Sequence, residues 1–187
     1  MNGDGGARHI LSILVENRFG ELCRVVGLFS GRGYNIDSLC VAPTSDPAFS
    51  RIILTTNGSD AIMEQIIKKV GKLVRVLEVI DLNDVEHVER EMALLIVTTR
   101  NPAERQEVLN LVGVFRAKVI DIAPDAITVE TTGSQDKVDA LLGLLKPLGI
   151  KEIVRTGAVA IPRISATRGR DEVHGPALAV PEADSAV

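Results

Sequence analysis

The chain has 187 residues, which is enough for one ordinary domain or two small ones. Apolar residues make up 45% of it and charged residues 25%, a composition typical of a globular protein with a core to bury. Its formal net charge of −4, and the lack of an apolar run near the roughly 20 residues of a membrane span, argue against nucleic-acid binding and membrane insertion.

Apolar periodicity in the first half of the chain predicts the element order βαββαβ. Residues His9 to Val15 form a short apolar run that is typical of a buried strand. From Glu21 to Ser30 the apolar residues are instead spaced as one face of a helix, and Gly31 follows as its C-cap. The expected elements are a strand over 9–15, a helix over 21–30, strands over 34–42 and 49–56, a helix over 62–70 and a strand over 73–82.

A polar stretch over 83–91 predicts a linker, after which the same order repeats. Asn101 and Pro102 are typical of a helix start, because asparagine caps the first turn and proline fits the first helical position. The expected elements are a strand over 92–99, a helix from Pro102, strands over 117–123 and 126–132, a helix over 138–145 and a strand over 150–161. The tail over 164–187 has no periodicity and is expected to be disordered.

The sequence therefore predicts an α+β protein with two ferredoxin-like βαββαβ domains, over 8–82 and 92–163. In each domain an antiparallel sheet would carry both helices on one face. The first strand nevertheless has apolar residues on both of its faces, which is not expected for a sheet with one solvent-exposed face. We expect the second face, or an edge strand, to be covered by another subunit or by the second domain, and we expect a symmetric homodimer.

No residues have the spacing of a catalytic or metal site. His9, His87 and His174 lie far apart in the sequence and share no spacing with the cysteines. Cys23 and Cys40 are expected in a helix and in a strand, where a free cysteine is usually a small apolar filler. Two cysteines are too few for a disulfide framework, and the N-terminus lacks a secretion signal, so we expect a cytoplasmic location.

Two other ligand classes are disfavoured by where their usual residues lie. A phosphate-binding glycine loop leads from a strand into a helix, whereas Gly31-Arg32-Gly33 follow a helix and lead into a strand. The RNA-binding module with the same βαββαβ order stacks bases on aromatic residues of its central strands. Here Tyr34 and Phe49 lie only at strand ends and the net charge is negative, so no nucleic-acid partner is expected.

The first strand-to-helix connection, over 16–22, leads into a helix N-terminus, where unpaired backbone N–H groups can hold a carboxylate. Asn17 offers both a donor and an acceptor, and Gly20 lets a ligand approach the backbone closely. An α-amino acid would suit this loop, with its carboxylate on the N–H groups and its ammonium on oxygen atoms. A helix cap with asparagine and glycine as turn formers fits these residues equally well, so both interpretations stay open at this point.

A longer ordered set of residues extends this loop along most of the chain. It comprises Asn17-x-x-Gly20-x-Leu22-x-Arg24-Val25, Gly27-Leu28-Phe29-Ser30-x-Arg32-Gly33-Tyr34-Asn35-Ile36, Ser38-Leu39-x-Val41-Ala42-Pro43-Thr44, Ser50-Arg51, Lys72-Leu73-Val74, His87-Val88-Glu89-Arg90-Glu91, Phe115-Arg116-Ala117, Val119-Ile120-Asp121 and Arg155-Thr156-Gly157. This set resembles the small, regulatory subunit of acetolactate (acetohydroxyacid) synthase with its ACT domain. The resemblance covers Arg8 to Arg163 and includes both predicted domains.

The resemblance implies a subunit that has no catalytic residue or cofactor of its own. It would bind a large catalytic subunit that uses thiamine diphosphate, Mg²⁺ and FAD, raise the activity of that subunit, and confer feedback inhibition, usually by valine. In the family the effector sits between two ACT domains of a dimer. The matching positions here are Asn17, Gly20, Glu21 and Leu22 from one chain, with Asn35 and Ile36 from the other.

Two departures from the family pattern bear on these expectations. Arg18-Phe19 varies the effector loop and bears on which branched-chain amino acid is preferred, and the tail after Arg163 is not required by the pattern. The alternative to an acetolactate synthase subunit is an ACT-type amino-acid sensor that regulates a different biosynthetic enzyme.

Overall fold

The computed structural model describes residues 6–167, which divide into two compact units. Within the described residues, the N-terminal unit comprises 6–88 together with 160–167, and the C-terminal unit comprises 89–159. No helix in the described part of the chain has the length and apolar character needed to cross a membrane.

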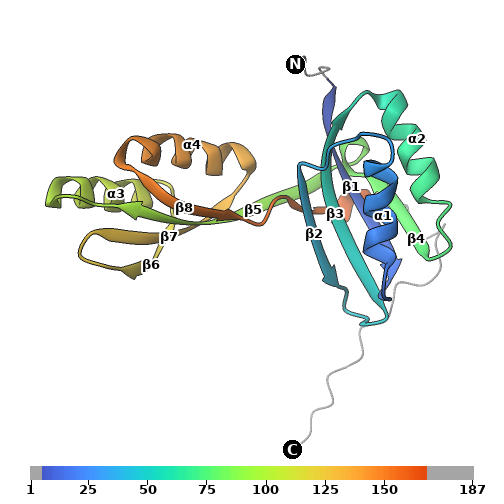
Figure 1. Ribbon diagram of the computed structural model, residues 1–187, viewed down its shortest axis with the longest axis horizontal. Helices are drawn as coiled ribbons and strands as arrows, with labels where there is room; N and C mark the ends of the chain where they lie inside the picture. Colours follow the sequence, from blue (N-terminus) through green and yellow to red (C-terminus); the bar gives the residue numbers. More distant parts are fainter. Residues whose placement is uncertain (1–5, 168–187) are drawn as a thin grey trace, which may run out of the picture. The chain divides into compact units, whose positions relative to one another are not determined.

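The N-terminal unit has the predicted βαββαβ order, and both of its helices lie on one face of the sheet (Figure 1). Its four strands are arranged in the order β2-β3-β1-β4, and each neighbouring pair is antiparallel. The elements are β1 (Ala7–Glu16), α1 (Glu21–Ser30), β2 (Ser38–Pro43), β3 (Phe49–Gly58), α2 (Asp60–Val70) and β4 (Val76–Asp81). Leu11, Ile13 and Val15 alternate toward the helices and pack with Val25 and Phe29 of α1, which fixes the register of β1.

The second face of this sheet is partly covered by the chain itself. Ile10 and Ile53 on that face are buried against Leu82 and Ala160. Leu82 begins a short 3₁₀ turn, η1 (Leu82–Asp84), directly after β4, and Ala160 lies far along the sequence, in β9 (Val159–Pro162). Ala160 belongs to the stretch predicted as the second domain, 92–163, so that part of the prediction is confirmed, although residues from Ala160 belong to the N-terminal unit. Leu82 adds a contribution from the first predicted domain itself. Cover by another subunit stays a prediction.

The C-terminal unit repeats the same order of elements, and its sheet has the order β6-β7-β5-β8, with β9 also paired to β5. Asn101 accepts a hydrogen bond of 2.9 Å from the Glu104 amide and Pro102 follows it, so the predicted helix start is confirmed. The elements are β5 (His87–Thr98), α3 (Pro102–Val114), β6 (Lys118–Ile122), β7 (Ala126–Gly133), α4 (Gln135–Leu145), η2 (Lys146–Leu148) and β8 (Ile150–Arg155). The described chain ends in α5 (Ile164–Thr167), which belongs to the N-terminal unit.

Several element boundaries differ from the predictions, and the larger differences among the strands lie where strand pairing decides the structure. Residues 87–91, which were predicted as linker, form the start of β5, because pairing within the sheet gives their polar backbone groups partners. The predicted strand over 150–161 is broken at Gly157, whose φ of 73° is left-handed, and residues from Ala160 join the N-terminal unit. The strand predicted over 34–42 begins only at Ser38. Of the predicted disordered tail over 164–187, the first four residues form α5, and 168–187 lie outside the described residues.

Candidate functional site

The loop between β1 and α1 is anchored to the turn between β2 and β3. The Asn17 backbone amide donates to the Ala48 carbonyl at 2.7 Å, and the Asn17 side-chain nitrogen donates to the Pro47 carbonyl at 2.9 Å. These two bonds use the backbone donor and one of the two side-chain N–H donors of Asn17, and its side-chain oxygen accepts no hydrogen bond from the described part of the chain. The loop is therefore held at the end of β2 with one amide oxygen left for a ligand.

Gly20 precedes α1 in a left-handed conformation, with φ 86° and ψ −7°. Residues with a Cβ are strained there, which explains the glycine. A Cβ added at Gly20 would meet no atom within 4 Å, so the space beside the backbone is open. The loop thus leaves room for a small molecule at the N-terminus of α1.

The first turn of α1 exposes unpaired backbone donors. Gly20 supplies no side-chain cap, and the Glu21 amide makes only a long hydrogen bond of 3.4 Å to the Arg18 carbonyl. The backbone amides of Leu22 and Cys23 donate to no acceptor among residues 6–167. Because the helix dipole also favours negative charge at this end, the turn is suited to a carboxylate.

The Glu21 side chain is committed to the protein itself. It is only 2% exposed, and its Oε1 accepts hydrogen bonds from Arg24 at 3.1 Å and from Arg75 at 2.9 Å. The Arg75 carbonyl also accepts a hydrogen bond of 3.0 Å from the Glu16 amide. Glu21 thereby joins α1 to the segment before β4, and these contacts hold the start of α1, next to the loop, in place.

Replacing Glu21 by glutamine is expected to destabilise the N-terminal unit by about 1–3 kcal/mol, because a buried acceptor of two charge-assisted hydrogen bonds loses its charge. Urea unfolding of the variant measures this change. Glu64→Gln is the matched control, because Glu64 also pairs with a cation on a helix, at 2.6 Å from Lys68, but both side chains are exposed. Equal unfolding midpoints for the two variants would show that the contacts of Glu21 do not support the loop.

Asn35 and Ile36 lie at the other end of the sheet within one chain. Ser38 begins β2 and pairs with Thr55, which in turn pairs with Ile10 near the start of β1. The loop after Glu16 is at the opposite end of β1, so the two groups are separated by roughly 20 Å of strand. The structure therefore brings Asn17, Gly20, Glu21 and Leu22 together, but a single copy does not bring them to Asn35 and Ile36.

The Asn35 side chain is exposed, and its amide group makes the same kind of contact as the amide group of Asn17. Its nitrogen donates to Asp37 at 2.7 Å, and its side-chain oxygen accepts no hydrogen bond from the described residues. The Asn35 backbone carbonyl accepts from the Thr56 hydroxyl at 2.6 Å, which fixes the segment before β2. Free amide oxygens at Asn17 and Asn35 match an ammonium group, and the free amides of α1 match a carboxylate. Within one copy, however, the oxygen of Asn35 lies too far from Asn17 and from these amides for one small molecule to contact all of them.

Sequence reasoning missed the supports of this loop and misplaced one cysteine. Arg75 is 54 residues from Glu21 along the chain, and no local pattern signals such a pair. Cys23 is exposed on α1, not an apolar filler of the core as predicted, because it projects from the solvent side of the helix. Phe19, beside Gly20, is fully exposed, and Leu22 is 38% exposed. Among residues 6–167 no three His, Cys, Asp or Glu side chains are grouped in a way that would hold a metal ion.

Both units match models of known protein families. Residues 11–78 match the family described as AHAS small subunit-like ACT domain, and residues 90–164 match the family described as small subunit of acetolactate synthase. The two matches together span both units. They therefore cover the loop between β1 and α1 and the entire predicted C-terminal domain.

Named relatives and a solved structure agree with these matches. The acetolactate synthase small subunit of Aquifex aeolicus is 46% identical over 156 residues, which is 83% of this chain and 81% of that protein. The acetolactate synthase isozyme 3 small subunit of Salmonella typhimurium is 46% identical over 157 residues, 83% of this chain and 96% of that protein. The crystal structure of the acetolactate synthase small subunit from Thermotoga maritima superposes with a TM-score of 0.76 at 39% identity, covering 84% of this chain and 98% of that one.

Proposed function

This chain belongs to the family of acetolactate synthase small subunits, and from this premise we propose that it is the regulatory subunit of an acetolactate synthase. The observation that carries the proposal is that both units match the family. If the chain were an ACT-type sensor of another enzyme, we would expect a match to an ACT domain alone, as over 11–78. Residues 90–164 match a second family, which is described as the small subunit of acetolactate synthase.

The partner that this function requires is a large catalytic subunit. We propose that the thiamine diphosphate, Mg²⁺ and FAD of the reaction are bound by that partner, and that this chain raises its activity and makes it sensitive to feedback inhibition. The chain itself is proposed to contribute no group to the chemical step.

The effector site is proposed to form between two copies of this chain. In the described sheet β2 is an edge strand, and two edge strands can pair antiparallel about a twofold axis. That pairing brings the start of β2 in one copy beside the end of β2 in the other. Because Asn17 is bonded to the turn that follows β2, its loop would meet Asn35 and Ile36 of the second copy.

Valine is the proposed effector, held by its carboxylate on the amides of Leu22 and Cys23 and by its ammonium on the oxygens of Asn17 and Asn35. A helix N-terminus contributes only about 0.3–2 kcal/mol to holding a carboxylate. Preference for a branched aliphatic side chain must therefore come from apolar contacts, for which Leu22 and Ile36 are the candidates. A coupling of about 1–3 kcal/mol would change the behaviour of the partner roughly 5- to 150-fold.

Calorimetry of the full chain with valine, leucine and isoleucine tests the effector, and assays of the complex with its catalytic subunit test the regulation. We expect valine to bind the chain alone, and to inhibit the complex but not the catalytic subunit alone. We also expect the complex to be more active than the catalytic subunit alone. A complex whose activity equals that of the free catalytic subunit, with and without valine, would contradict the proposed function.

A further inference from the structure

The chain passes between its two units twice, between residues 88 and 89 and between residues 159 and 160. The first passage lies inside β5 and the second inside β9. These two strands pair with each other, so both passages lie within paired strands and neither is an independent loop. A structural change carried along the backbone from one unit to the other would pass through this pair of strands.

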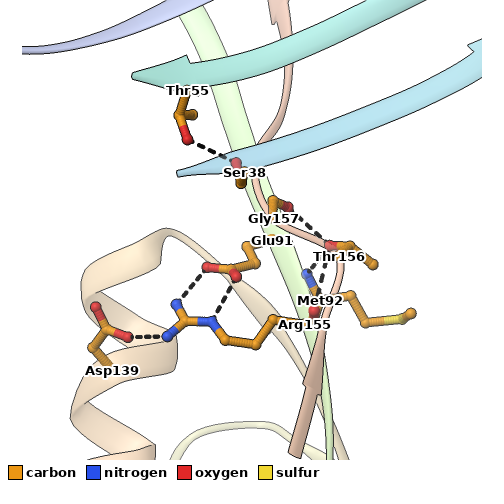
Figure 2. Close-up of polar contacts among 8 residues, drawn as sticks. All are labelled: Ser38, Thr55, Glu91, Met92, Asp139, Arg155, Thr156 and Gly157. Carbon is orange, nitrogen blue, oxygen red and sulfur yellow. Dashed lines mark hydrogen bonds and ion pairs between the residues drawn. The ribbon is translucent and has the colours of Figure 1, made fainter. Parts of the chain in front are cut away.

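A partly buried ion pair of the C-terminal unit lies within a few residues of both passages (Figure 2). Both oxygens of the Glu91 carboxylate accept hydrogen bonds from the Arg155 guanidinium, each at 2.7 Å. The Glu91 side chain is 6% exposed, and Arg155 also donates to Asp139 of α4 at 2.7 Å. The guanidinium thus ties the start of β5 and the end of β8 to a helix of the same unit.

Thr156, the residue after Arg155 and one position nearer to the second passage, also forms hydrogen bonds with β5. Its amide donates to the Met92 carbonyl at 3.0 Å, and its hydroxyl accepts from the Met92 amide at 3.1 Å (Figure 2). Gly157 then turns the chain with a left-handed φ of 73°. The hydrogen bond to Glu91, with that to Asp139, raises the pKa of the Arg155 guanidinium above its usual range, so its charge is not lost near neutral pH.

We propose that Glu91 and Arg155 are positioning residues that transmit effector binding in the N-terminal unit to the C-terminal unit, by holding the two chain passages in fixed register. A planar guanidinium bound through two parallel hydrogen bonds fixes orientation as well as distance, which a single contact would not do. The inference rests on the proposed function, since it concerns the regulation that the effector loop would exert.

The test compares Glu91→Gln and Arg155→Lys in the complex with the catalytic subunit. Lysine keeps the positive charge but loses the two-pronged geometry. We expect valine to bind the full-length variants within about twofold of wild type, while the valine-dependent change in activity falls at least about fivefold, the lower end of ordinary allosteric coupling. Glu130→Gln is the control, because Glu130 forms a more exposed ion pair with Lys118, at 3.4 Å in the same sheet, and should leave regulation unchanged.

Two results would overturn the inference. Variants that bind valine and are inhibited as strongly as wild type would show that the ion pair transmits nothing. Variants that lose activation and co-purification with the catalytic subunit, along with inhibition, would show that the pair only keeps the C-terminal unit folded. Failure of the wild-type chain to bind valine would instead refute the proposed effector, which makes the two failures distinguishable.

Discussion

Replacing Gly20 by aspartate should abolish inhibition by valine, with the fold left intact. Gly20 lies at φ 86°, and aspartate is among the residues that tolerate this region best. An added Cβ there meets no atom within 4 Å, so the side chain extends into the open space that the effector would occupy. Its carboxylate would also compete with the carboxylate of valine for the free amides of α1. We expect the half-inhibitory concentration of valine to rise at least about 100-fold, a loss near 2.8 kcal/mol.

Gly20→Asn is the matched control, because asparagine has nearly the same shape and tolerates the same backbone conformation without the charge. Its effect on inhibition should lie between those of glycine and aspartate. Activation of the catalytic subunit should be preserved in both variants. A Gly20→Asp complex that remains fully sensitive to valine would mean that the effector does not bind at this loop.

Replacing Asn35 by histidine should weaken valine inhibition to a similar degree, although Asn35 lies at the far end of the sheet from Gly20. The Asn35 oxygen is free to accept from the effector ammonium, and an imidazole ring cannot place an acceptor at the same point. The side chain is exposed, and the Asn35 backbone carbonyl keeps its bond to Thr56 in the variant. Calorimetry with valine and unfolding by urea, on the same preparation, separate lost binding from lost stability.

Asn57→His serves as the control for this substitution. Asn57 is also exposed, and its side-chain nitrogen donates to the same residue, Asp37, at 2.6 Å. A loss of binding that acted only through Asp37 would appear in both variants. We expect valine affinity to fall for Asn35→His alone, and equal losses in the two variants would remove Asn35 from the site.

The sequence predicted those elements whose signals are local. The bounds of α1 follow from apolar spacing between Glu21 and Ser30, and the start of α3 follows from Asn101 and Pro102. The early start of β5 and the return of β9 were missed, because strand pairing depends on partners that are distant in the sequence. Composition alone made the residues before Met92 look like a linker.

The candidate site was predictable to a similar extent. Asn17 and Gly20 could be singled out from their position before a helix, but the residues alone did not separate a ligand site from a helix cap. Asn35 and Ile36 entered only through the family resemblance, since nothing in their local sequence connects them with the loop. The buried contacts of Glu21 with Arg75 needed the folded structure, because the ion pair joins segments that meet only when β4 pairs with β1.

The central claim is that each effector site is built from two copies of this chain, and mixed dimers test it most directly. A Gly20→Asp chain and an Asn35→His chain would be co-expressed with different tags and the mixed dimer purified. One of its two sites would carry both substitutions and the other would carry neither. We expect the mixed dimer to bind valine with wild-type affinity at half the wild-type stoichiometry, while neither homodimer binds. A mixed dimer that binds no better than the homodimers would contradict a site shared between copies.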